Sequence, residues 1–431
     1  MNNFIEKIRQ NSFVLQILTL MSGTLMAQVV LLAFIPILTR LYTPTEFGNY
    51  SLFFILSTII GSVSSLRYEQ AIMLPKSDRD AQVLLFISAL LTIFISFILS
   101  IILFIFYDFF LNYFNQLSYL VWLLPLSVLI TGLVQIFNSY STRKKFYKKM
   151  AGVKVIESIT TVGTQGISRY FFALDGLIVG KFISNIYTLY LLVKYHLKKQ
   201  TLQLKYFTKR RTKANLKRHE NFPKYFAMAT LLNSISQNIP ILLFTALFSP
   251  AIAGFYALTH RILQAPIQLV ANSTRSVYYQ KASELYANRE DIRPLYFSTT
   301  KGLIKLFIVP FIIIALFGQE IFSLIFGAEW VISGLIAQIT IIWFFFTFIN
   351  PPVTVMYNIF GQQKAQLLFQ IMGLFTRTLA IYAGFYIFDS YIYSIIIFTV
   401  VSVIHNLLIF GYIYKIMHKI YANKIYKEKT V

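Results

Sequence analysis

Long runs of apolar residues recur from one end of this chain to the other, separated by short polar connections. Each run is long enough for an α-helix to cross a hydrocarbon core of about 30 Å. No soluble core needs so much apolar sequence, so the pattern predicts an all-α integral membrane protein with about twelve transmembrane helices. The predicted spans are 12–38, 47–74, 83–106, 119–140, 151–172, 174–195, 225–248, 251–278, 302–326, 331–357, 365–388 and 391–415.

Part of the pattern around the first two spans is repeated about 206 residues later. In both places an apolar run ends at a short turn with proline, and a second run starts after a glycine. The shared residues are Leu41-Tyr42-Thr43-Pro44, Phe47-Gly48, Tyr50 and Leu52 in the first copy, and Leu247-Phe248-Ser249-Pro250, Ala253-Gly254, Tyr256 and Leu258 in the second. A duplicated unit of six spans explains this, and its even number of spans predicts parallel repeats related by a pseudo-twofold axis along the membrane normal.

A long basic connection separates spans one to six from spans seven to twelve. Basic residues alternate there with Tyr206, Phe207, Leu216 and Phe222, which leaves two roles open: a solvated linker that fixes topology, or an amphipathic strip on an anionic leaflet. The predicted organisation is an N-terminal lobe at 1–200, a basic cytoplasmic linker at 201–224, a C-terminal lobe at 225–415 and a basic cytoplasmic tail at 416–431.

The net charge of +23 follows the predicted topology. Lys and Arg gather in the connections after even-numbered spans, whereas the connections at 107–118, 249–250, 318–330 and 388–390 contain neither. This positive-inside pattern predicts that both termini are cytoplasmic, and it accounts for the charge without a nucleic-acid partner. The first span is longer than the apolar region of a signal peptide, so we expect no cleavable signal.

Charged residues inside the spans are the main clue to cargo, because they are costly in lipid and usually face a polar cavity. At 1.5 Å per residue, Arg261 and Arg377 fall near the bilayer midplane. The acids counted within the spans are only Glu69 and Glu157, so we expect most of the cations to lack an internal partner. The candidate substrate-binding residues are Arg261, Arg377, Arg67, Lys154, Arg275, Lys181, Arg169 and Arg40.

Such an excess of buried cations favours an anionic cargo, because an anion lowers the cost of their burial. The planar guanidinium of arginine also matches phosphate oxygens. Two simpler readings stay open: Lys154 and Glu157 have the spacing of helix neighbours and could pair with each other, and the cations near span ends could extend to an interface. Glu69 and Glu157 are the candidates for carrying a coupled proton.

Catalytic and metal-binding motifs are not found in the sequence. It has no Cys, no paired His spacing, no GxSxG motif and no P-loop. Asp78-Arg79-Asp80 is similar to the metal-binding triplet of nucleotide-sugar glycosyltransferases, but it lies in a short connection with no catalytic domain attached. We therefore expect a secondary transporter without cofactor or metal. Prolines in or beside the spans predict bends at Pro36, Pro125, Pro240, Pro266, Pro310 and Pro351-Pro352.

Several short motifs, in order along nearly the whole chain, resemble the bacterial polysaccharide (Wzx-type) flippases. They are Pro36-Ile37-Leu38-Thr39-Arg40-Leu41-Tyr42-Thr43-Pro44, Phe47-Gly48, Leu66-Arg67-Tyr68-Glu69, Ala71-Ile72, Leu74-Pro75-Lys76, Arg143 with Phe146, Arg261 with Pro266, Tyr279-Gln280-Lys281-Ala282, Phe326-Gly327, Glu329-Trp330, Gly334 and Gly361-Gln362-Gln363. Tyr140 departs from the family, which often has Trp there. The resemblance implies the multidrug/oligosaccharidyl-lipid/polysaccharide (MOP) exporter fold, with two six-helix lobes in a V around a central cationic cavity.

The resemblance also implies a function. A protein of this family moves undecaprenyl-pyrophosphate-linked oligosaccharide repeat units across the bacterial inner membrane for O-antigen, capsule or exopolysaccharide synthesis. Its partners would be this substrate, membrane lipids, a glycan polymerase and a chain-length regulator. Three alternatives stay open. A multidrug exporter of the same superfamily would have acids in its cavity, and a major-facilitator transporter would have a glycine-rich motif after span two, which is missing here. A membrane glycan polymerase usually needs a large outer loop.

Overall fold

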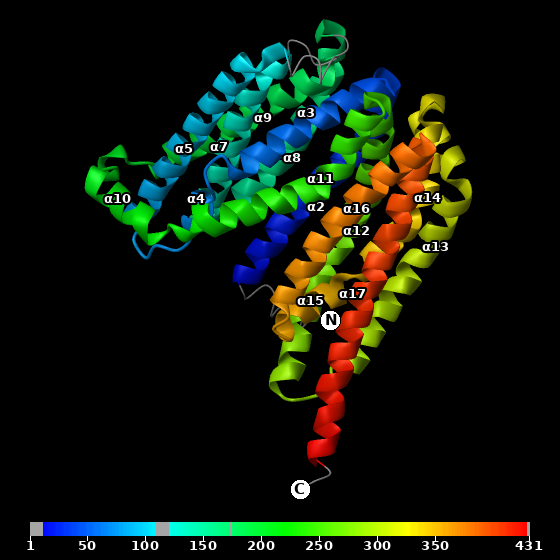
Figure 1. The fold of residues 1–431 in the computed structure, drawn as a ribbon. Coiled ribbons are helices and arrows are strands. Elements are labelled where there is room, and N and C mark those ends of the chain that lie inside the picture. The colour runs from blue at the N-terminus through cyan, green and yellow to red at the C-terminus, as the bar shows by residue number, and fades with distance from the viewer. Residues whose placement is uncertain (1–11, 109–119, 173–174, 429–431) are drawn as a thin grey trace. The chain divides into compact units, whose positions relative to one another are not determined.

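The computed structural model describes residues 12–108, 120–172 and 175–428, and the regular structure within them is helical (Figure 1). Twelve long helices follow one another in the order of the predicted spans, which confirms the all-α membrane fold. They are α2 (Ser12–Leu41), α3 (Pro44–Val63), α5 (Asp78–Ile105), α7 (Leu123–Arg143), α8 (Tyr147–Phe172), α9 (Gly176–Lys198), α11 (Ala227–Leu247), α12 (Pro250–Ala287), α13 (Arg293–Phe326), α14 (Val331–Ile349), α16 (Gln363–Phe388) and α17 (Tyr391–Glu428). The short helices are α4 (Tyr68–Ala71), α10 (Lys209–Arg218) and α15 (Pro351–Ile359), with single turns at Leu120–Trp122, Leu204–Tyr206, Phe222–Phe226 and Ala328–Trp330.

Polarity divides the long helices into two groups. Nine described helices are long and apolar enough to cross a membrane. The other three are α3, α8 and α12, with 20, 26 and 38 residues, of which α8 and α12 are more polar than the rest. Helix α8, for example, carries Lys154, Glu157 and Arg169. The more polar helices are thus among those that hold the candidate charged residues.

The chain divides into two compact units, Met1–Ala246 and Leu247–Val431. In the first unit, α8 packs between α2 and α9, while α7 packs against α3, α5 and α9. In the second, α14 packs against α12, α13 and α17, and α16 pairs with α17. Because the division falls at the end of α11, the lobe boundaries expected at 201–224 remain a prediction.

The repeated turn has the same local structure in both units. Thr43 caps α3 and Pro44 is its first residue, and Ser249 caps α12 with Pro250 in the same place. A hydroxyl side chain at this position accepts a hydrogen bond from an otherwise unpaired helix amide, and proline is tolerated where no amide bond is needed. The repeat seen in the sequence is therefore a helix-start signal.

Two predicted spans are broken. Span two ends as α3, and the chain then adopts left-handed backbone at Leu66 (φ 51°) and Arg67 (φ 64°) before α4. This break contains no proline; instead the Arg67 guanidinium donates to the Ser62 carbonyl over 3.2 Å. Span ten breaks where Pro351 begins α15, as the proline pair predicted. By contrast, Pro36, Pro240 and Pro266 lie within continuous helices, and α13, which contains Pro310, is kinked at Phe317 (φ −119°, ψ 22°).

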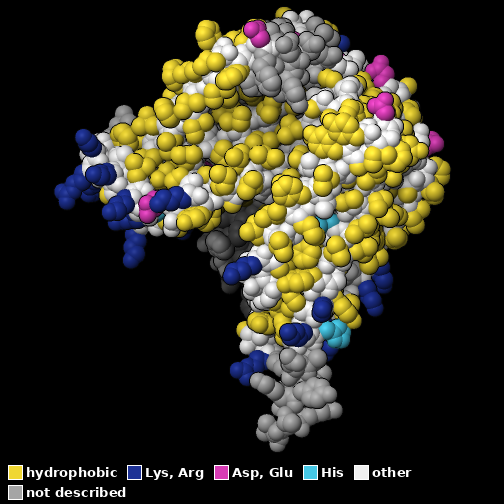
Figure 2. Space-filling model, viewed as in Figure 1, with side chains coloured by type: hydrophobic (Ala, Val, Ile, Leu, Met, Phe, Trp, Pro, Cys, Tyr) yellow, Lys and Arg dark blue, Asp and Glu magenta, His cyan; other side chains and the backbone are white. Residues whose placement is uncertain are grey.

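Small and polar side chains fill the helix contacts, while apolar side chains cover much of the outer surface (Figure 2). Ser88, Thr92 and Ser184 are fully buried, whereas the side chain of Phe97 is 61% exposed. A Cβ atom on Gly180 would lie 2.6 Å from the backbone of Gln165, so α8 and α9 approach too closely there for any other residue. This distribution is typical of helices that pack inside a bilayer.

Candidate substrate-binding residues

Arg169 is held in an ion pair at the turn between α2 and α3. Its guanidinium pairs with Glu46, whose side chain is 4% exposed, and lies 5.1 Å from the centre of the Tyr42 ring. Glu46 also accepts a hydrogen bond from the Thr43 amide at 2.6 Å and completes a capping box. Glu46 lies one residue before the predicted span 47–74 and so was not among the acids expected inside the spans. The Thr43-x-x-Glu46 spacing of a capping box was the signal that could have located this carboxylate.

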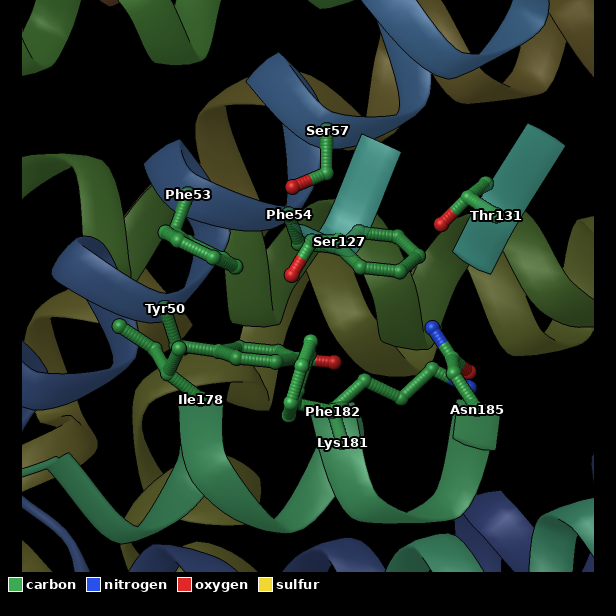
Figure 3. Close-up of a pocket in the computed structure, with 10 residues that line it drawn as sticks. All are labelled: Tyr50, Phe53, Phe54, Ser57, Ser127, Thr131, Ile178, Lys181, Phe182 and Asn185. Carbon is green, nitrogen blue, oxygen red and sulfur yellow. The ribbon is translucent and has the colours of Figure 1, made fainter. Parts of the chain in front are cut away.

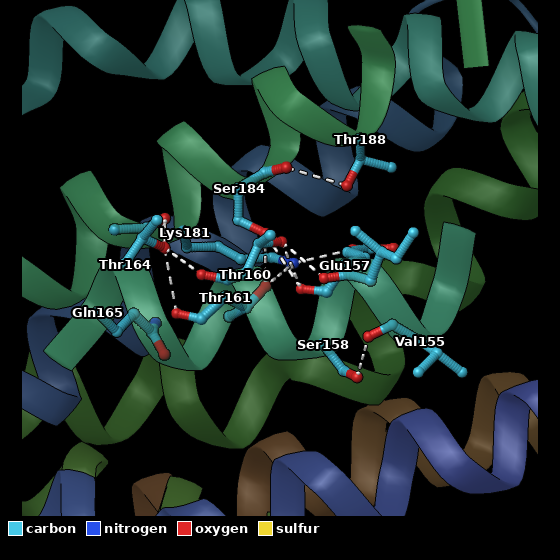
Figure 4. A network of polar contacts seen from close by, with 12 residues as sticks. Val155, Glu157, Ser158, Thr160, Thr161, Thr164, Gln165, Lys181, Ser184 and Thr188 are labelled. Atoms are coloured by element: carbon cyan, nitrogen blue, oxygen red, sulfur yellow. Dashed lines mark hydrogen bonds and ion pairs between the residues drawn. The ribbon is translucent and has the colours of Figure 1, made fainter. Parts of the chain in front are cut away.

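Lys181 is also paired, within a polar seam between α8 and α9 (Figure 4). Its ammonium lies 2.9 Å from the Glu157 carboxylate and 3.4 Å from the Thr161 hydroxyl. The Ser184 hydroxyl continues the seam with contacts of 3.0 Å to Thr160 and 2.8 Å to Thr161. The structure therefore brings two predicted site residues, Lys181 and Glu157, into direct contact.

Lys154 does not pair with Glu157, although their spacing on one helix allowed it. The two side chains leave α8 in different directions: Glu157 contacts α9, whereas the Lys154 ammonium donates to the Thr24 hydroxyl of α2 at 3.0 Å. Lys154 is half-buried, and no carboxylate of a described residue lies within ion-pair distance of it. It is the clearest uncompensated cation inside the first unit.

A very small cleft, with an accessible volume of about 10 Å³, lies beside Lys181 between α3, α7 and α9 (Figure 3). Tyr50 and Phe54 form part of its wall with ring centroids 5.8 Å apart. Ser57 and Asn185 add polar groups. The cleft has room for about one water molecule, and its Lys181 ammonium is already paired with Glu157, so it is part of the packing of the first unit.

The carboxylate of Glu69 is fully buried beside the break that follows α3. It pairs with Arg67 at 3.2 Å, accepts a hydrogen bond from the Gln135 amide at 2.9 Å and accepts another from the Ser65 hydroxyl. The Arg67 side chain is itself only 13% exposed. Three donors thus surround one buried carboxylate, and a role for Glu69 in proton coupling stays a prediction.

Arg40 and Arg275 lie on exposed surfaces of α2 and α12. Arg40 donates to the Pro36 carbonyl at 3.1 Å, and Arg275 to the Asn272 side chain at 3.4 Å. Both contacts are local to one helix. Neither residue is brought together with another candidate cation by these bonds.

In the second unit, Arg377 is bound by neutral groups. Its Nε donates to the Ser402 hydroxyl at 3.1 Å, and the guanidinium lies 5.8 Å from the centre of the Trp343 ring. Trp343 packs against Phe344 with ring centroids 4.8 Å apart. Arg377 is eleven residues from the end of α16, about 17 Å along the helix, and so near the middle of a span. Among the described residues no carboxylate pairs with it.

Arg261 lies at a similar depth, eleven residues from the start of α12. It is half-buried and makes no hydrogen bond, ion pair or ring contact with any residue in the described ranges. The adjacent His260 is surrounded by rings, with centroid distances of 6.0 Å to Tyr256 and 5.8 Å to Phe344. The chain thus places a free guanidinium next to a packed aromatic group.

The candidate cations therefore fall into two classes. The expectation that most lack an internal partner is wrong for Arg67, Lys181 and Arg169, because carboxylates placed nearby by the fold neutralise them. Arg261 and Arg377 have no such carboxylate among the described residues. Trp343 and Ser402, which contact Arg377, were not identified from the sequence because neither is distinctive without its neighbour.

The Asp78-Arg79-Asp80 triplet forms the first turn of α5. Asp78 pairs with Arg143 at 3.2 Å and with Lys144. Arg143 also donates to the carbonyls of Ile72 at 2.9 Å and Pro75 at 2.8 Å, so it fixes the connection between α4 and α5. In the part of the chain that the structure describes, no group of three or more His, Asp or Glu could hold a metal ion.

Comparison with known proteins supports one family. The family model described as "Polysaccharide biosynthesis protein" matches residues 37–335. The chain is similar in structure to the lipid II flippase MurJ in an inward closed conformation, with a TM-score of 0.73 and 14% identity over 91% of this chain and 87% of that one. No curated protein sequence matches it.

Two transporters of the MOP superfamily are also similar. One is from Pyrococcus furiosus. It matches with a TM-score of 0.61 and 14% identity, and the match covers 93% of this chain and 95% of that transporter's chain. The other, an outward-facing multidrug resistance transporter of the MATE family, has a TM-score of 0.59 and 15% identity, with 94% and 96% covered. These TM-scores show a common fold, and the family match covers more than half of the chain. The chain therefore belongs to the polysaccharide biosynthesis protein family and has the MOP-superfamily fold, which confirms its resemblance to the polysaccharide flippases.

Proposed function

We propose that this protein is a flippase that translocates polyprenyl-pyrophosphate-linked oligosaccharide repeat units across the bacterial cytoplasmic membrane, with both termini in the cytoplasm. The product would serve O-antigen, capsule or exopolysaccharide synthesis. The observation that carries the proposal is the pair Arg261 and Arg377, two guanidinium groups in the middle of spans without a carboxylate partner among the described residues. Membership of the polysaccharide biosynthesis family supports a glycan as part of the substrate, and the two cations support a pyrophosphate group in it.

Arg261 and Arg377 would bind the pyrophosphate during translocation. A guanidinium cannot lose its charge, and it binds two phosphate oxygens at once. Each arginine is held by neutral groups or by none, so its charge remains available to a ligand. In the first unit, Lys154 would be available to an anionic ligand, because its ammonium contacts only a hydroxyl among the described residues. Arg261, Arg377 and Lys154 are therefore the substrate-binding residues that we propose.

The remaining candidates would have other roles. Arg67, Lys181 and Arg169 would stabilise the fold of the first unit, since each is neutralised by an acid. Arg40 and Arg275 would lie where the headgroup enters or leaves, because both are exposed. Glu157 and Glu69 stay the candidates for coupling to a proton. The proposed protein partners are a glycan polymerase and a chain-length regulator.

Deletion of the gene followed by complementation tests this function. Without the protein, lipid-linked repeat units should accumulate in the cytoplasmic leaflet, and surface glycan should be lost. The wild-type chain should restore glycan, and Arg261→Ala and Arg377→Ala should not, although both variants reach the membrane. Lys364→Ala, which removes an exposed cation from the same helix as Arg377, is the matched control and should complement fully. Normal glycan in the deletion strain would contradict the flippase function; export of cationic drugs without any effect on glycan would favour the multidrug alternative.

A further inference from the structure

The basic linker between the two halves is packed against the first unit. The Leu216 carbonyl of α10 accepts a hydrogen bond from the Tyr68 hydroxyl at 3.3 Å, and the Asn215 amide contacts Asp80 at 3.4 Å. The Gln203 amide donates to Gln82 at 2.8 Å. Burial lowers the pKa of His219 at the end of α10, which favours the neutral, packed form at neutral pH. The segment therefore packs on the first unit along one face, while most of its basic side chains are exposed.

An open pocket of about 430 Å³ lies where the linker meets the start of α5. Three of its lining side chains are the cations Arg79, Lys144 and Lys199. Its acid, Asp78, is already paired with Arg143 and Lys144, so the pocket keeps a net positive charge. The pocket is a polar hollow suited to an anionic group.

The Tyr206 ring organises the cations at this pocket. Arg79, Lys205 and Arg211 lie 5.5, 5.3 and 5.9 Å from its centre. Cation–π contacts of this kind hold the charges in place without neutralising them. Beside the pocket, the outward face of α10 presents five further exposed cations, and Figure 2 shows Lys and Arg side chains gathered at the end of the unit where Figure 1 places α10. They are Lys209, Arg210, Lys213, Lys217 and Arg218.

An apolar surface begins directly beside this charge. On α5, the residues that share a face with Arg79 at helical spacing are Phe86, Leu90 and Phe97. Leu90 is 52% exposed and Phe97 61% exposed, and Phe86 packs edge to face on Phe207 of the linker with centroids 5.8 Å apart. A soluble anion would gain nothing from this surface. An acyl chain would cover it while the headgroup stayed at the cations.

We propose that the Arg79–Lys199 pocket and the outward face of α10 form a binding site for an anionic phospholipid of the leaflet on that side. The phosphate contacts Arg79 and Lys199, and the acyl chains lie along α5 towards Leu90, about 17 Å from Arg79 along the helix. The site is distinct from the proposed cargo site and does not depend on the proposed function. It gives the linker between the two halves a fixed place at the membrane surface.

Thermal unfolding of the full-length protein in detergent tests the site with defined lipids. Phosphatidylglycerol should raise the melting temperature, and phosphatidylcholine with the same acyl chains should not. Arg79→Gln/Lys199→Gln should weaken the apparent affinity for phosphatidylglycerol at least about tenfold, since each surface cation contributes roughly fivefold. Lys415→Gln/Lys419→Gln, which removes two exposed charges from α17, should bind as tightly as the wild type.

Three results would overturn the proposal. Equal stabilisation by both lipids would show that charge is not recognised. Unchanged affinity in the double variant would place the lipid elsewhere. Equal stabilisation by glycerophosphoglycerol or inorganic pyrophosphate would show a site for soluble anions. Lys199→Gln alone, at an exposed side chain, keeps the test decisive if the double variant folds poorly, and should still lose about fivefold.

Discussion

The two copies of the repeated turn share their backbone and differ in their charges. In the first unit, Tyr42 donates to the Gln165 carbonyl at 2.6 Å and its ring lies against Arg169. In the second, Phe248 occupies the same place and packs against Phe385 and Tyr391, with centroids 5.2 and 6.4 Å apart. A polar cluster in one copy is thus an aromatic cluster in the other.

The same contrast extends along each unit. Where the first unit has Glu46 in its capping box, the second has Ile252. Three candidate cations of the first unit are paired with acids, while Arg261 and Arg377 of the second have no acid partner among the described residues. We infer that the first unit uses charges chiefly for its own structure, and that the second leaves them for a ligand.

The largest effect on stability is expected from Glu69→Ala. The substitution leaves Arg67 buried without its partner and removes the acceptor for Gln135 and Ser65. Breaking one partner of a buried ion pair costs about 3–5 kcal/mol in free energy of unfolding. Unfolding of the purified protein measures the loss. Glu69→Gln, which can keep part of the hydrogen bonding, is the control and should lose less; a Glu69→Ala variant as stable as the wild type would show that the pair has no structural role.

Glu46→Ala should have the next largest effect. It removes the capping box of α3 and leaves Arg169 unpaired, so we expect a loss of about 2 kcal/mol from the two terms together. The same unfolding measurement applies, with Arg169→Ala as the partner variant. In a double-mutant cycle the two losses should not add, because both break one contact. Additive losses would mean that Glu46 and Arg169 act separately.

Lys154 and Lys181 allow a comparison, within the first unit, of a cation without an acid partner and a cation with one. Lys154→Ala should lower the rate of substrate translocation about tenfold, since it removes a cation that the proposed ligand can use. Lys181→Ala should chiefly lower stability, because its charge is already used by Glu157. Translocation in proteoliposomes and unfolding in detergent separate the two outcomes. Equal translocation by both variants would remove Lys154 from the binding set.

The smallest effect on stability is expected from the helix caps that the two copies of the turn share. Thr43→Ala and Ser249→Ala each remove a side chain that caps a helix, so each should cost about 1 kcal/mol of unfolding free energy. Thr43→Ser and Ser249→Thr keep the cap and are the matched controls. A cost confined to one copy would show that the repeated turn serves the fold in only one unit.

The sequence predicted what depends on local pattern. Apolar runs located the twelve long helices, and the repeated proline turn located two helix starts, because length and capping are properties of neighbouring residues. Ion pairing depends on the fold and was missed: Glu46 and Arg169 are 123 residues apart. The spacing of Lys154 and Glu157 was misleading, since each contacts a different helix. The break before α4 was missed because a side chain and left-handed backbone produce it without proline.

A translocation assay in proteoliposomes tests the central claim most directly. Vesicles with a polyprenyl-pyrophosphate-linked oligosaccharide would hold wild type, Arg377→Ala or Arg169→Ala, and the fraction of substrate reaching the opposite leaflet would be measured. Arg377 has no acid partner among the described residues, whereas Arg169 has Glu46. We predict that Arg377→Ala abolishes translocation in a folded protein and that Arg169→Ala retains most of it after allowance for lost stability. Full translocation by Arg377→Ala would contradict the account.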